Sequence, residues 1–359
     1  MRIVAKEFPL IKPFTFSVRE RLIEGVPDGF LLLKPVVAGI CGSELLYFRG
    51  EKEEWKLRER LPMCLLHEGV AEIIHNPAGT GELQPGTFVV VNPLIPCGRC
   101  SSCLTLGENY CQNAKFMGST ADGLARSHLL YPNGRVIPVP EDVELELAAL
   151  TEPLSVALNA YQIASIKPGE RVCVIGDGPI GYLVALISSH VGRVSRDRLF
   201  VMGVVDEKLD LAEDFALTVN TACDDTERFN GFFDVVFEAV GGRVHRLTLR
   251  EAICFAKAGG RCVLLGLSHG EVPVDINQVV NRGLSIMGSV RSRMEHYRTV
   301  LDLMRDEEFG GRVKRIISER RFTIRSAEDL YAAFRYADTE EGEAKTKPGR
   351  VLVYLAICD

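Results

Sequence analysis

The sequence lacks the long apolar run that a membrane-spanning helix requires. About 20 consecutive apolar residues are needed to cross the hydrocarbon layer, and every apolar run in this chain meets a charge or a glycine before that length. The first residues, MRIVAKEFPLIKPF, carry charges and prolines where a signal peptide has an unbroken apolar core. These absences predict a soluble, cytoplasmic protein.

A surplus of basic residues is also missing. Lys and Arg total 42 against 48 Asp and Glu, which gives a formal net charge of −6. Nucleic acids and anionic membranes attract proteins through basic surface. The charge balance therefore argues against both partners and leaves a small-molecule substrate as the expected one.

The eleven cysteines do not form a disulfide pattern. Four of them stand singly in apolar, strand-like runs, where a thiol behaves as a small apolar side chain. We expect these four in the core of a protein kept in a reducing compartment. They are Cys173, Cys254, Cys262 and Cys358.

A chain of 359 residues exceeds one ordinary core and predicts two domains. Residues 28–140 contain short β-rich runs broken by Gly and Pro, which is typical of an all-β domain. From residue 172 the runs VCVIG, LFVMG, DVVFEAV and RCVLLGL alternate with helical patterns, which indicates an α/β, doubly wound parallel sheet. We predict a first domain over 1–150, a second over 151–290, and a return of 291–359 to the first.

Four cysteines fall within the 15-residue segment CGRCSSCLTLGENYC. Their spacing suits one tetrahedral Zn²⁺ held by four thiolates. Such a closed site supports structure rather than catalysis. Disulfides or unrelated thiols are the alternative, which this spacing disfavours. The cysteines are Cys97, Cys100, Cys103 and Cys111.

A glycine-rich turn follows the run VCVIG. Gly176, Gly178 and Gly181 stand between an apolar strand and a helical pattern, with Pro179 and Ile180 among them. In dinucleotide-binding sheets the first glycine permits the tight turn, the second admits the pyrophosphate and the third lets helix and strand pack. The helix N-terminus then faces the anion. Without such flanking elements, this glycine pattern often marks only a turn. Its place between a strand and a helix predicts NAD or NADP binding.

The end of the next strand, LFVMG, should discriminate between the two cofactors. An acidic side chain there accepts the ribose hydroxyls of NAD, whereas a small residue leaves room for the phosphate of NADP. Gly203 favours NADP. Asp206 is the alternative ribose acceptor, although it can instead cap a helix that begins at Glu207. The cations available to an NADP phosphate are Lys208, Arg196 and Arg198.

A second set of metal-binding side chains is spread over three segments. Cys41 stands in GICGSELLYF, His67 and Glu68 in LLHEGVAEI, and Glu152 in LTEPLSVALNA. A thiolate, an imidazole and a carboxylate can hold zinc with one position open, which polarises a carbonyl or lowers the pKa of an alcohol. Ser43 offers a hydroxyl through which a proton can leave. Alone, each residue would instead suggest a core thiol, a satisfied histidine or a helix cap.

These motifs, in this order and with the terminal KPGRVLVYL, resemble the zinc-dependent medium-chain dehydrogenase/reductase family over essentially the whole chain. The polyol dehydrogenase branch is the most similar. The resemblance implies a GroES-like β-rich catalytic domain and a Rossmann domain, with the four-cysteine loop as a structural zinc site. It also implies a homodimer or a homotetramer, and it places Leu265 and Gly266 of RCVLLGL near the nicotinamide.

By motif position the resemblance implies that Cys41 and His67 are ligands of the catalytic zinc and that Ser43 relays the proton. Glu68 is then the acid that can exchange with water at the metal, and Glu152 is the third protein ligand or its neighbour. Which of the two glutamates binds at rest stays open.

The chain also departs from the family pattern. Leu66 replaces the glycine of the usual GHE, and Glu44 replaces the aspartate of the usual CGSD.

Several segments, among them RLPMCLLHEGVAEI and FEAVGGRVH, resemble bacterial ribulose-5-phosphate reductases, which use NADPH. In that case Arg291 and Ser292 are candidates for holding a substrate phosphate, with solvated surface as the alternative. Further candidates are Tyr47 and Phe116 for the substrate pocket and Arg49, Lys52 and Arg293 for the phosphate.

The predicted function is a zinc-dependent oxidoreductase that moves hydride between NAD(P) and a secondary alcohol or ketone, in a sugar polyol or a polyol phosphate. The alternatives are a ribulose-5-phosphate reductase specifically and a threonine-type dehydrogenase, which shares every motif. A zinc- and nucleotide-binding protein without chemistry is a further alternative. Loss of a catalytic ligand would be its first sign, and no candidate ligand is missing.

Overall fold

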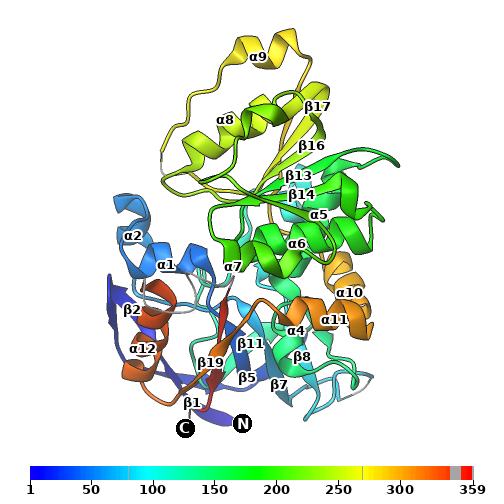
Figure 1. The fold of residues 1–359 in the computed structure, drawn as a ribbon. Helices are drawn as coiled ribbons and strands as arrows, with labels where there is room; N and C mark the ends of the chain where they lie inside the picture. The colour runs from blue at the N-terminus through cyan, green and yellow to red at the C-terminus, as the bar shows by residue number, and fades with distance from the viewer. Residues whose placement is uncertain (80, 269, 340–348, 358–359) are drawn as a thin grey trace. The chain divides into compact units, whose positions relative to one another are not determined.

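The computed structural model describes residues 1–79, 81–268, 270–339 and 349–357, which form two compact units (Figure 1). The first unit contains Met1–Glu152 together with residues 293–339 and 350–357. The second contains Pro153–Ser292. The domain roles predicted for 1–150, 151–290 and 291–359 stay predictions at this stage.

The first unit is rich in strands. They are β1 (Arg2–Glu7), β2 (Pro9–Lys12), β3 (Thr15–Phe16), β4 (Arg19–Glu24), β5 (Phe30–Gly39), β6 (Met63–Cys64), β7 (Glu68–His75), β8 (Phe88–Val91), β9 (Leu94–Ile95), β10 (Lys115–Phe116), β11 (Leu129–Pro132), β12 (Val136–Pro138), β19 (Ile317–Ile324) and β20 (Arg350–Leu355). The main sheet has the order β12-β8-β7-β5-β20-β19, with β11 also paired to β5. All its pairs are antiparallel except β19 with β20.

Helices also occur in this unit, so the prediction of an all-β segment over 28–140 was wrong in detail. The helices are α1 (Gly42–Phe48), α2 (Glu54–Arg60), α3 (Ser101–Thr105), α4 (Leu145–Ala148), α10 (Met294–Leu303), α11 (Glu307–Lys314) and α12 (Ala327–Asp338). The first three span only five to seven residues each. Two turns of helix are too short to show a clear period of 3.6 in the sequence, which is why they were missed.

The core of the first unit joins strands from both ends of the chain. Leu31 and Leu33 of β5 are fully buried, as are Val351 and Val353 of β20, and all four belong to one apolar cluster. Residues two apart on a strand face the same side of a sheet. Each such side chain contributes about 1.5–3 kcal/mol when fully buried. The last strand is therefore an integral part of the first unit.

The second unit is a six-stranded parallel sheet of order β15-β14-β13-β16-β17-β18. This confirms the predicted α/β architecture. The strand order reverses at β13, and ligands bind at such switch points in open parallel sheets. The strands are β13 (Val172–Ile175), β14 (Leu199–Gly203), β15 (Leu217–Asn220), β16 (Phe233–Glu238), β17 (Ala256–Leu264) and β18 (Ser285–Gly288). The helices are α5 (Thr151–Ala164), which begins at the boundary, α6 (Pro179–His190), α7 (Asp206–Leu209), α8 (His245–Phe255) and α9 (Ile276–Asn281).

The predicted core thiols belong to this sheet and its helices. Cys173 of β13 and Cys262 of β17 are fully buried, as expected. Cys254 of α8 is only half-buried, with its thiol near Gln278. Cys358 lies outside the described residues.

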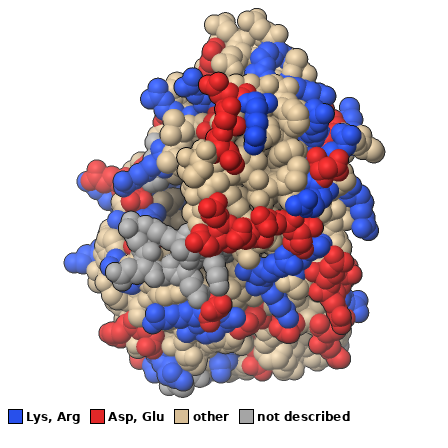
Figure 2. Space-filling view, viewed as in Figure 1, with Lys and Arg blue, Asp and Glu red and all other residues tan. Residues whose placement is uncertain are grey.

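The surface agrees with the charge analysis. On the face shown in Figure 2, basic and acidic side chains are interspersed. Within the described parts of the chain, no helix has both the length and the apolar character needed to cross a membrane.

The turn from β13 into α6 shows why two of its glycines are required. Gly176 has φ +131°, a conformation that L side chains rarely adopt. A Cβ on Gly181 would lie 1.9 Å from the carbonyl oxygen of Gly176. A Cβ on Gly178 would meet nothing within 4 Å, and its φ of −76° suits any residue. Gly181 is therefore needed for packing, whereas Gly178 leaves open space where a ligand could approach.

We predict that Gly181→Ala and Gly178→Ala have opposite effects. Gly181→Ala should destabilise the protein by about 1–3 kcal/mol, because backbone must move to admit the methyl group. Gly178→Ala should lower the free energy of unfolding by less than about 1 kcal/mol, as at other helix N-caps. It should nevertheless weaken dinucleotide binding. Denaturant unfolding and titration of NADH or NADPH measure the two effects. Equal losses of stability in the two variants would contradict this account of the turn.

Candidate functional site

Three predicted metal ligands come together in the first unit. The Sγ of Cys41, a ring nitrogen of His67 and a carboxylate oxygen of Glu68 all lie within 4.8 Å of one another. Sheet pairing explains the meeting, because Gly39 at the end of β5 stands opposite Glu68 at the start of β7. Cys41 follows β5 by two residues, and His67 directly precedes β7. The antiparallel register therefore assembles the group.

Glu44, the departure from the family pattern, holds this group in place. Its carboxylate accepts hydrogen bonds from the backbone N–H of Cys41 at 3.2 Å and of Leu66 at 2.5 Å. The same carboxylate lies 3.0 Å from Nδ1 of His67. A carboxylate of this kind only accepts, so Nδ1 carries the proton and Nε2 keeps its lone pair for a metal. Glu44 therefore fixes both segments of the group, although the usual CGSD motif has aspartate at this position.

Leu66 explains why glycine is usual at its position. Its φ is +74°, in the left-handed region that costs a residue with a Cβ about 1–2 kcal/mol. The Leu66 side chain is fully buried in the core of the first unit, which offsets that cost. Leucine therefore adopts here a backbone conformation that favours glycine.

Glu68 is a fully buried carboxylate whose charge is only partly matched. Its Oε2 lies 3.1 Å from Nε of Arg350, and its Oε1 lies 3.9 Å from Nε2 of His67. Within the described residues neither oxygen accepts a hydrogen bond of good geometry. Arg350 is itself buried and donates from Nη1 to the carbonyl of Ile40 at 3.0 Å. A carboxylate oxygen left in this way suits a cation.

The charges around the group also favour a cation. Burial raises the pKa of Glu152 to about 7, an effect that His67 opposes and Glu68 reinforces. Burial lowers the pKa of His67, but the carboxylate of Glu44 and the Cys41 side chain together raise it well above its usual value. A site that gathers one thiol and three carboxyl groups, with Arg350 as the neighbouring guanidinium, fits a divalent metal. The donor set matches an open zinc site.

Glu152 is not in the group whose ligand atoms lie within 4.8 Å of one another. It is buried and interacts electrostatically with His67 and Glu68, so it is a neighbour of the group. Its role as third ligand stays a prediction.

The four-cysteine loop forms a second, separate cluster of thiols. Cys97, Cys100, Cys103 and Cys111 lie within 4.8 Å of one another at their sulfur atoms, with Cys100 3.5 Å from Cys103. Cys100 precedes α3, and a short turn over Glu108–Tyr110 leads into Cys111. Hydrogen bonds from the backbone N–H groups of Arg99 and Cys100 lower the pKa of Cys97 to about 6, which favours its thiolate. This arrangement suits a four-coordinate structural zinc.

The base of this loop is anchored to the start of α10. Glu108 accepts from the backbone N–H of Met294 at 2.9 Å and from Nη1 of Arg135 at 2.7 Å. Asn109 accepts from Nε of Arg293 at 3.1 Å. Arg293, a candidate for holding phosphate, is therefore occupied by the loop.

In the second unit, Asp177 occupies the place predicted for cofactor discrimination. A Cβ on Gly203 would lie 2.5 Å from Cβ of Asp177, so this side chain fills the space that glycine leaves. Asp177 Oδ2 accepts from the backbone N–H groups of Val204 at 2.8 Å and Val205 at 3.0 Å. An acidic group thus does stand at the end of β14, supplied by the glycine-rich turn.

Other predictions for this edge were wrong or remain open. α7 begins at Asp206 rather than Glu207, and Asp206 does not cap it: its carboxylate accepts from Nδ2 of Asn220 at 2.6 Å. Arg196 and Arg198 precede β14 and donate to the carbonyls of Glu213 and Gly169. The amino end of a parallel strand is the wrong end for the cofactor. Lys208 of α7 remains a candidate.

Glu238 is a buried acid at the carboxyl end of the parallel sheet that the sequence reasoning missed, and it is a further candidate there. It ends β16, is fully buried, and accepts from the N–H groups of Val240 and Gly241 and from Oγ1 of Thr248. A Cβ on Gly266 would lie 2.4 Å from its Oε2. The backbone N–H groups of Leu265 and Gly266 donate to the carbonyl of Glu238. The signal was an acid that ends an apolar strand just before two glycines.

The substrate candidates have different environments. Tyr47 is buried on α1, with its hydroxyl close to Ser119 and Arg60. Arg49 pairs with Glu51 and Asp338, which removes it as a free cation. In the second unit, Ser292 is buried with its hydroxyl 2.7 Å from that of Ser155, and Arg291 has φ +52°. The roles of Tyr47, Arg291 and Ser292 in substrate binding stay predictions.

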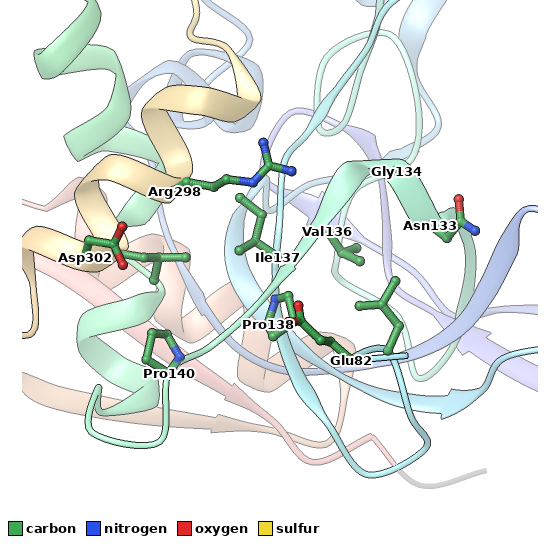
Figure 3. Close-up of a pocket in the computed structure, with 11 residues that line it drawn as sticks. Glu82, Asn133, Gly134, Val136, Ile137, Pro138, Pro140, Arg298 and Asp302 are labelled. Carbon is green, nitrogen blue, oxygen red and sulfur yellow. The ribbon is translucent and has the colours of Figure 1, made fainter. Parts of the chain in front are cut away.

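A separate hollow of about 440 Å³ lies in the first unit, lined by β12 and α10 (Figure 3). Arg298 and Asp302 of α10 stand over Ile137 and Pro140 there. The lining includes none of the predicted site residues. The hollow is therefore separate from the candidate metal site at Cys41, His67 and Glu68.

Comparison with known proteins identifies the family of the chain. Residues 27–141 match the alcohol dehydrogenase GroES-like domain, and residues 179–306 match the zinc-binding dehydrogenase domain. The chain is 28% identical over 349 residues to ribulose-5-phosphate reductase 1 of Staphylococcus aureus, covering 96% of this chain and 98% of that protein. It is 30% identical over 291 residues to L-idonate 5-dehydrogenase (NAD(P)(+)) of Escherichia coli, covering 78% and 82%.

Solved structures show the same fold. The crystal structure of L-idonate 5-dehydrogenase from Escherichia coli aligns with a TM-score of 0.83 at 25% identity and covers 99% of both chains. The prediction of a GroES-like domain joined to a Rossmann sheet is confirmed. With its thiolate, imidazole and carboxylate site and its four-cysteine loop, the chain belongs to the zinc-type medium-chain dehydrogenase family.

Proposed function

We propose that this protein is a zinc-dependent oxidoreductase that transfers hydride between NAD(P) and a secondary alcohol or ketone in a sugar polyol or a polyol phosphate. The observation that carries the proposal is the meeting of Cys41, His67 and Glu68 in a buried site rich in acidic groups. The glycine turn at the switch point of the parallel sheet supports the cofactor.

The names of the relatives support a polyhydroxylated substrate. These relatives are named for the reduction of ribulose 5-phosphate and the dehydrogenation of L-idonate, and both compounds carry several hydroxyl groups. A threonine-type dehydrogenase is the second candidate, because an L-threonine 3-dehydrogenase is also 28% identical over 304 residues. The two candidates share every motif, so a comparison of substrates is needed to separate them.

The residues of the first unit have distinct parts in this reaction. Cys41, His67 and Glu68 would hold zinc, with Glu152 as the alternative to Glu68. Bound zinc supplies a Lewis acid for the substrate oxygen, and the nicotinamide exchanges the hydride. Ser43 lies half-exposed, with its hydroxyl 3.3 Å from Sγ of Cys41. This hydroxyl can therefore pass a proton between the substrate oxygen and water.

We also propose a homodimer or a homotetramer in the cytoplasm, without nucleic acid or membrane partners. In support, β18 has a sheet neighbour on one side only among the described strands, with Ile286 36% exposed. Open edges of this kind favour pairing with another chain. All cysteines in the described residues are free, as in a reducing compartment. Light scattering and cell fractionation would measure the two properties.

The activity test is oxidation of NADH and of NADPH with ribulose, ribulose 5-phosphate, fructose and sorbose. We expect turnover with at least one ketose. Zinc is measured on the same sample, with two ions per chain expected. No turnover with any ketose, together with turnover of L-threonine and NAD⁺, would replace the polyol assignment by the threonine-type one.

Two cysteine variants should separate the two proposed zinc sites. Cys41→Ser should abolish turnover and remove one zinc while leaving thermal stability nearly unchanged. Cys103→Ser should remove the other zinc and lower the unfolding temperature by several degrees, at about 2–4 °C per kcal/mol for a domain of this size. The two effects are read by metal analysis, kinetics and thermal unfolding.

Cys223→Ser is the matched control, because Cys223 is an exposed thiol outside both sites. It should change none of the three readouts. Full activity of Cys41→Ser would overturn the assignment of the catalytic zinc.

Asp177 leads to a prediction about cofactor choice. A 2′-phosphate near Gly203 would meet the Asp177 carboxylate, and like charges repel. We therefore expect NADH to be used at least as well as NADPH, although Gly203 alone favours NADP. Asp177→Asn keeps the shape and removes the charge, and should raise the ratio of kcat/KM for NADPH to that for NADH by about tenfold.

Asp206→Asn removes an equal charge from an exposed residue of the same edge and is the control. If Asp206→Asn shifts the cofactor ratio and Asp177→Asn does not, then Asp206 is the ribose acceptor.

A further inference from the structure

We propose that Lys52, Arg60 and Ser119 form a subsite for an oxyanion, a phosphate monoester being the best match, at the end of the substrate remote from the reacting carbon. This inference rests on the proposed function, because it names the class of substrate that the same site would take. It places the phosphate in the first unit rather than at Arg291 and Ser292.

The subsite is built around two hydroxyl groups and one guanidinium. Nη1 of Arg60 donates to the hydroxyl of Tyr47 at 2.5 Å and to that of Ser119 at 3.2 Å. The two hydroxyl oxygens lie 3.4 Å apart. Tyr47 is buried, whereas Arg60 and Ser119 are half-exposed. Tyr47 therefore orients the guanidinium while the other two groups remain accessible to a ligand.

Lys52 adds a second cation beside the same tyrosine. Its Nζ lies 5.3 Å from the centre of the Tyr47 ring. Burial lowers the pKa of Lys52, and the charges of Lys56 and Arg60 lower it further, against the opposing effects of Glu53 and Cys41. Crowding of cations that lowers an ammonium pKa is relieved when an anion binds between them.

Lys52 and Arg60 differ from the other basic residues of this segment in their ion pairing. Lys56 pairs with Glu53, and Arg58 pairs with Glu54 on the exposed side of α2. Within the described residues, Arg60 and Lys52 have no carboxylate at ion-pair distance. Two cations without a carboxylate, one of them fixed by a buried hydroxyl, provide the charge and the donors that an oxyanion requires.

The subsite lies within reach of the metal-binding group. Ser119 follows Gly118, where a Cβ would come within 3.3 Å of Nδ1 of His67. The ring of Phe116 packs edge-on against His67, with 5.4 Å between centroids. Tyr47 follows Cys41 by six residues, about 9 Å along a helix at 1.5 Å per residue. A short-chain sugar could therefore have its carbonyl near Cys41 and His67 and its anionic end at Arg60.

The chemistry favours a phosphate over a carboxylate. A phosphate monoester carries nearly two charges and three acceptor oxygens at neutral pH. Arg60, Lys52 and the Ser119 hydroxyl offer two charges and several donors. A carboxylate has one charge and two oxygens, and would leave part of the subsite unmatched. Both are oxyanions, so the experiment includes one of each.

The test compares wild-type holoenzyme with Arg60→Gln and Lys52→Gln on three substrates. These are ribulose 5-phosphate, ribulose and, in the oxidative direction, L-idonate. We expect the wild type to prefer ribulose 5-phosphate to ribulose. Each variant should lower the ratio of their kcat/KM values by about 10- to 100-fold, the size of one charge-assisted hydrogen bond. The loss should fall mainly on KM, because the contact is made with a group that does not react.

Arg58→Gln is the matched control, with the same charge change on the same helix and a side chain 75% exposed. It should leave the ratio unchanged, and Arg60→Lys should restore part of it. If the variants lose selectivity for L-idonate over ribulose instead, the bound oxyanion is a carboxylate and the subsite stands. Equal loss on ribulose and ribulose 5-phosphate would mean that Arg60 only supports Tyr47, and the subsite is then rejected.

Failure of the subsite is distinguishable from failure of the proposed function. A wild-type enzyme that reduces ribulose and ribulose 5-phosphate equally well, and that shows no preference for L-idonate, keeps the function and loses the subsite. A zinc-loaded wild type that turns over none of the three substrates counts against the polyol function before any variant is made.

Discussion

The buried carboxylate of Glu44 is the contact on which the arrangement of the reactive group depends. One side chain fixes the backbone of Cys41, the backbone of Leu66 and the imidazole of His67. The two segments that carry these groups are more than twenty residues apart in sequence. A shared hydrogen-bond partner is therefore needed to fix their positions relative to each other. The partner is anionic and buried, and it can be stable there only because donors surround it. The pairing of β5 with β7 sets the scaffold, and Glu44 sets the directions of the side chains.

Motifs whose partners lie close in sequence could be predicted from the sequence. The four thiols from Cys97 to Cys111 and the glycines from Gly176 to Gly181 are of this kind, because spacing alone nearly determines their geometry. Contacts between distant segments could not be predicted. Arg350 beside Glu68 and Asp177 beneath Gly203 depend on sheet register, which one sequence does not reveal. The prediction that Asp206 caps α7 was wrong for a similar reason. Its carboxylate instead binds Asn220, which lies at the end of β15.

The two thiol-containing sites use opposite physical strategies within one unit. The four-cysteine loop surrounds its centre with four thiol groups, and hydrogen bonds to Glu108 and Asn109 anchor its base. The site at Cys41 has fewer donors, and Glu68 keeps carboxylate oxygens without a good hydrogen bond in the described structure. A saturated centre resists exchange, whereas an unsaturated one remains reactive. The difference follows from the number of donors rather than from their identity.

The pairing of β20 with β5 has a consequence for the order of assembly during synthesis. β5 leaves the ribosome long before its neighbour β20 and the guanidinium of Arg350 are made. The parallel sheet of the second unit is continuous in sequence and can form while the first unit still lacks a strand. Until Arg350 has been made, its guanidinium cannot balance the charge of the Glu68 carboxylate. A nascent chain therefore passes through a stage with one complete unit and one open β-sheet, which is when aggregation and chaperone binding are most expected.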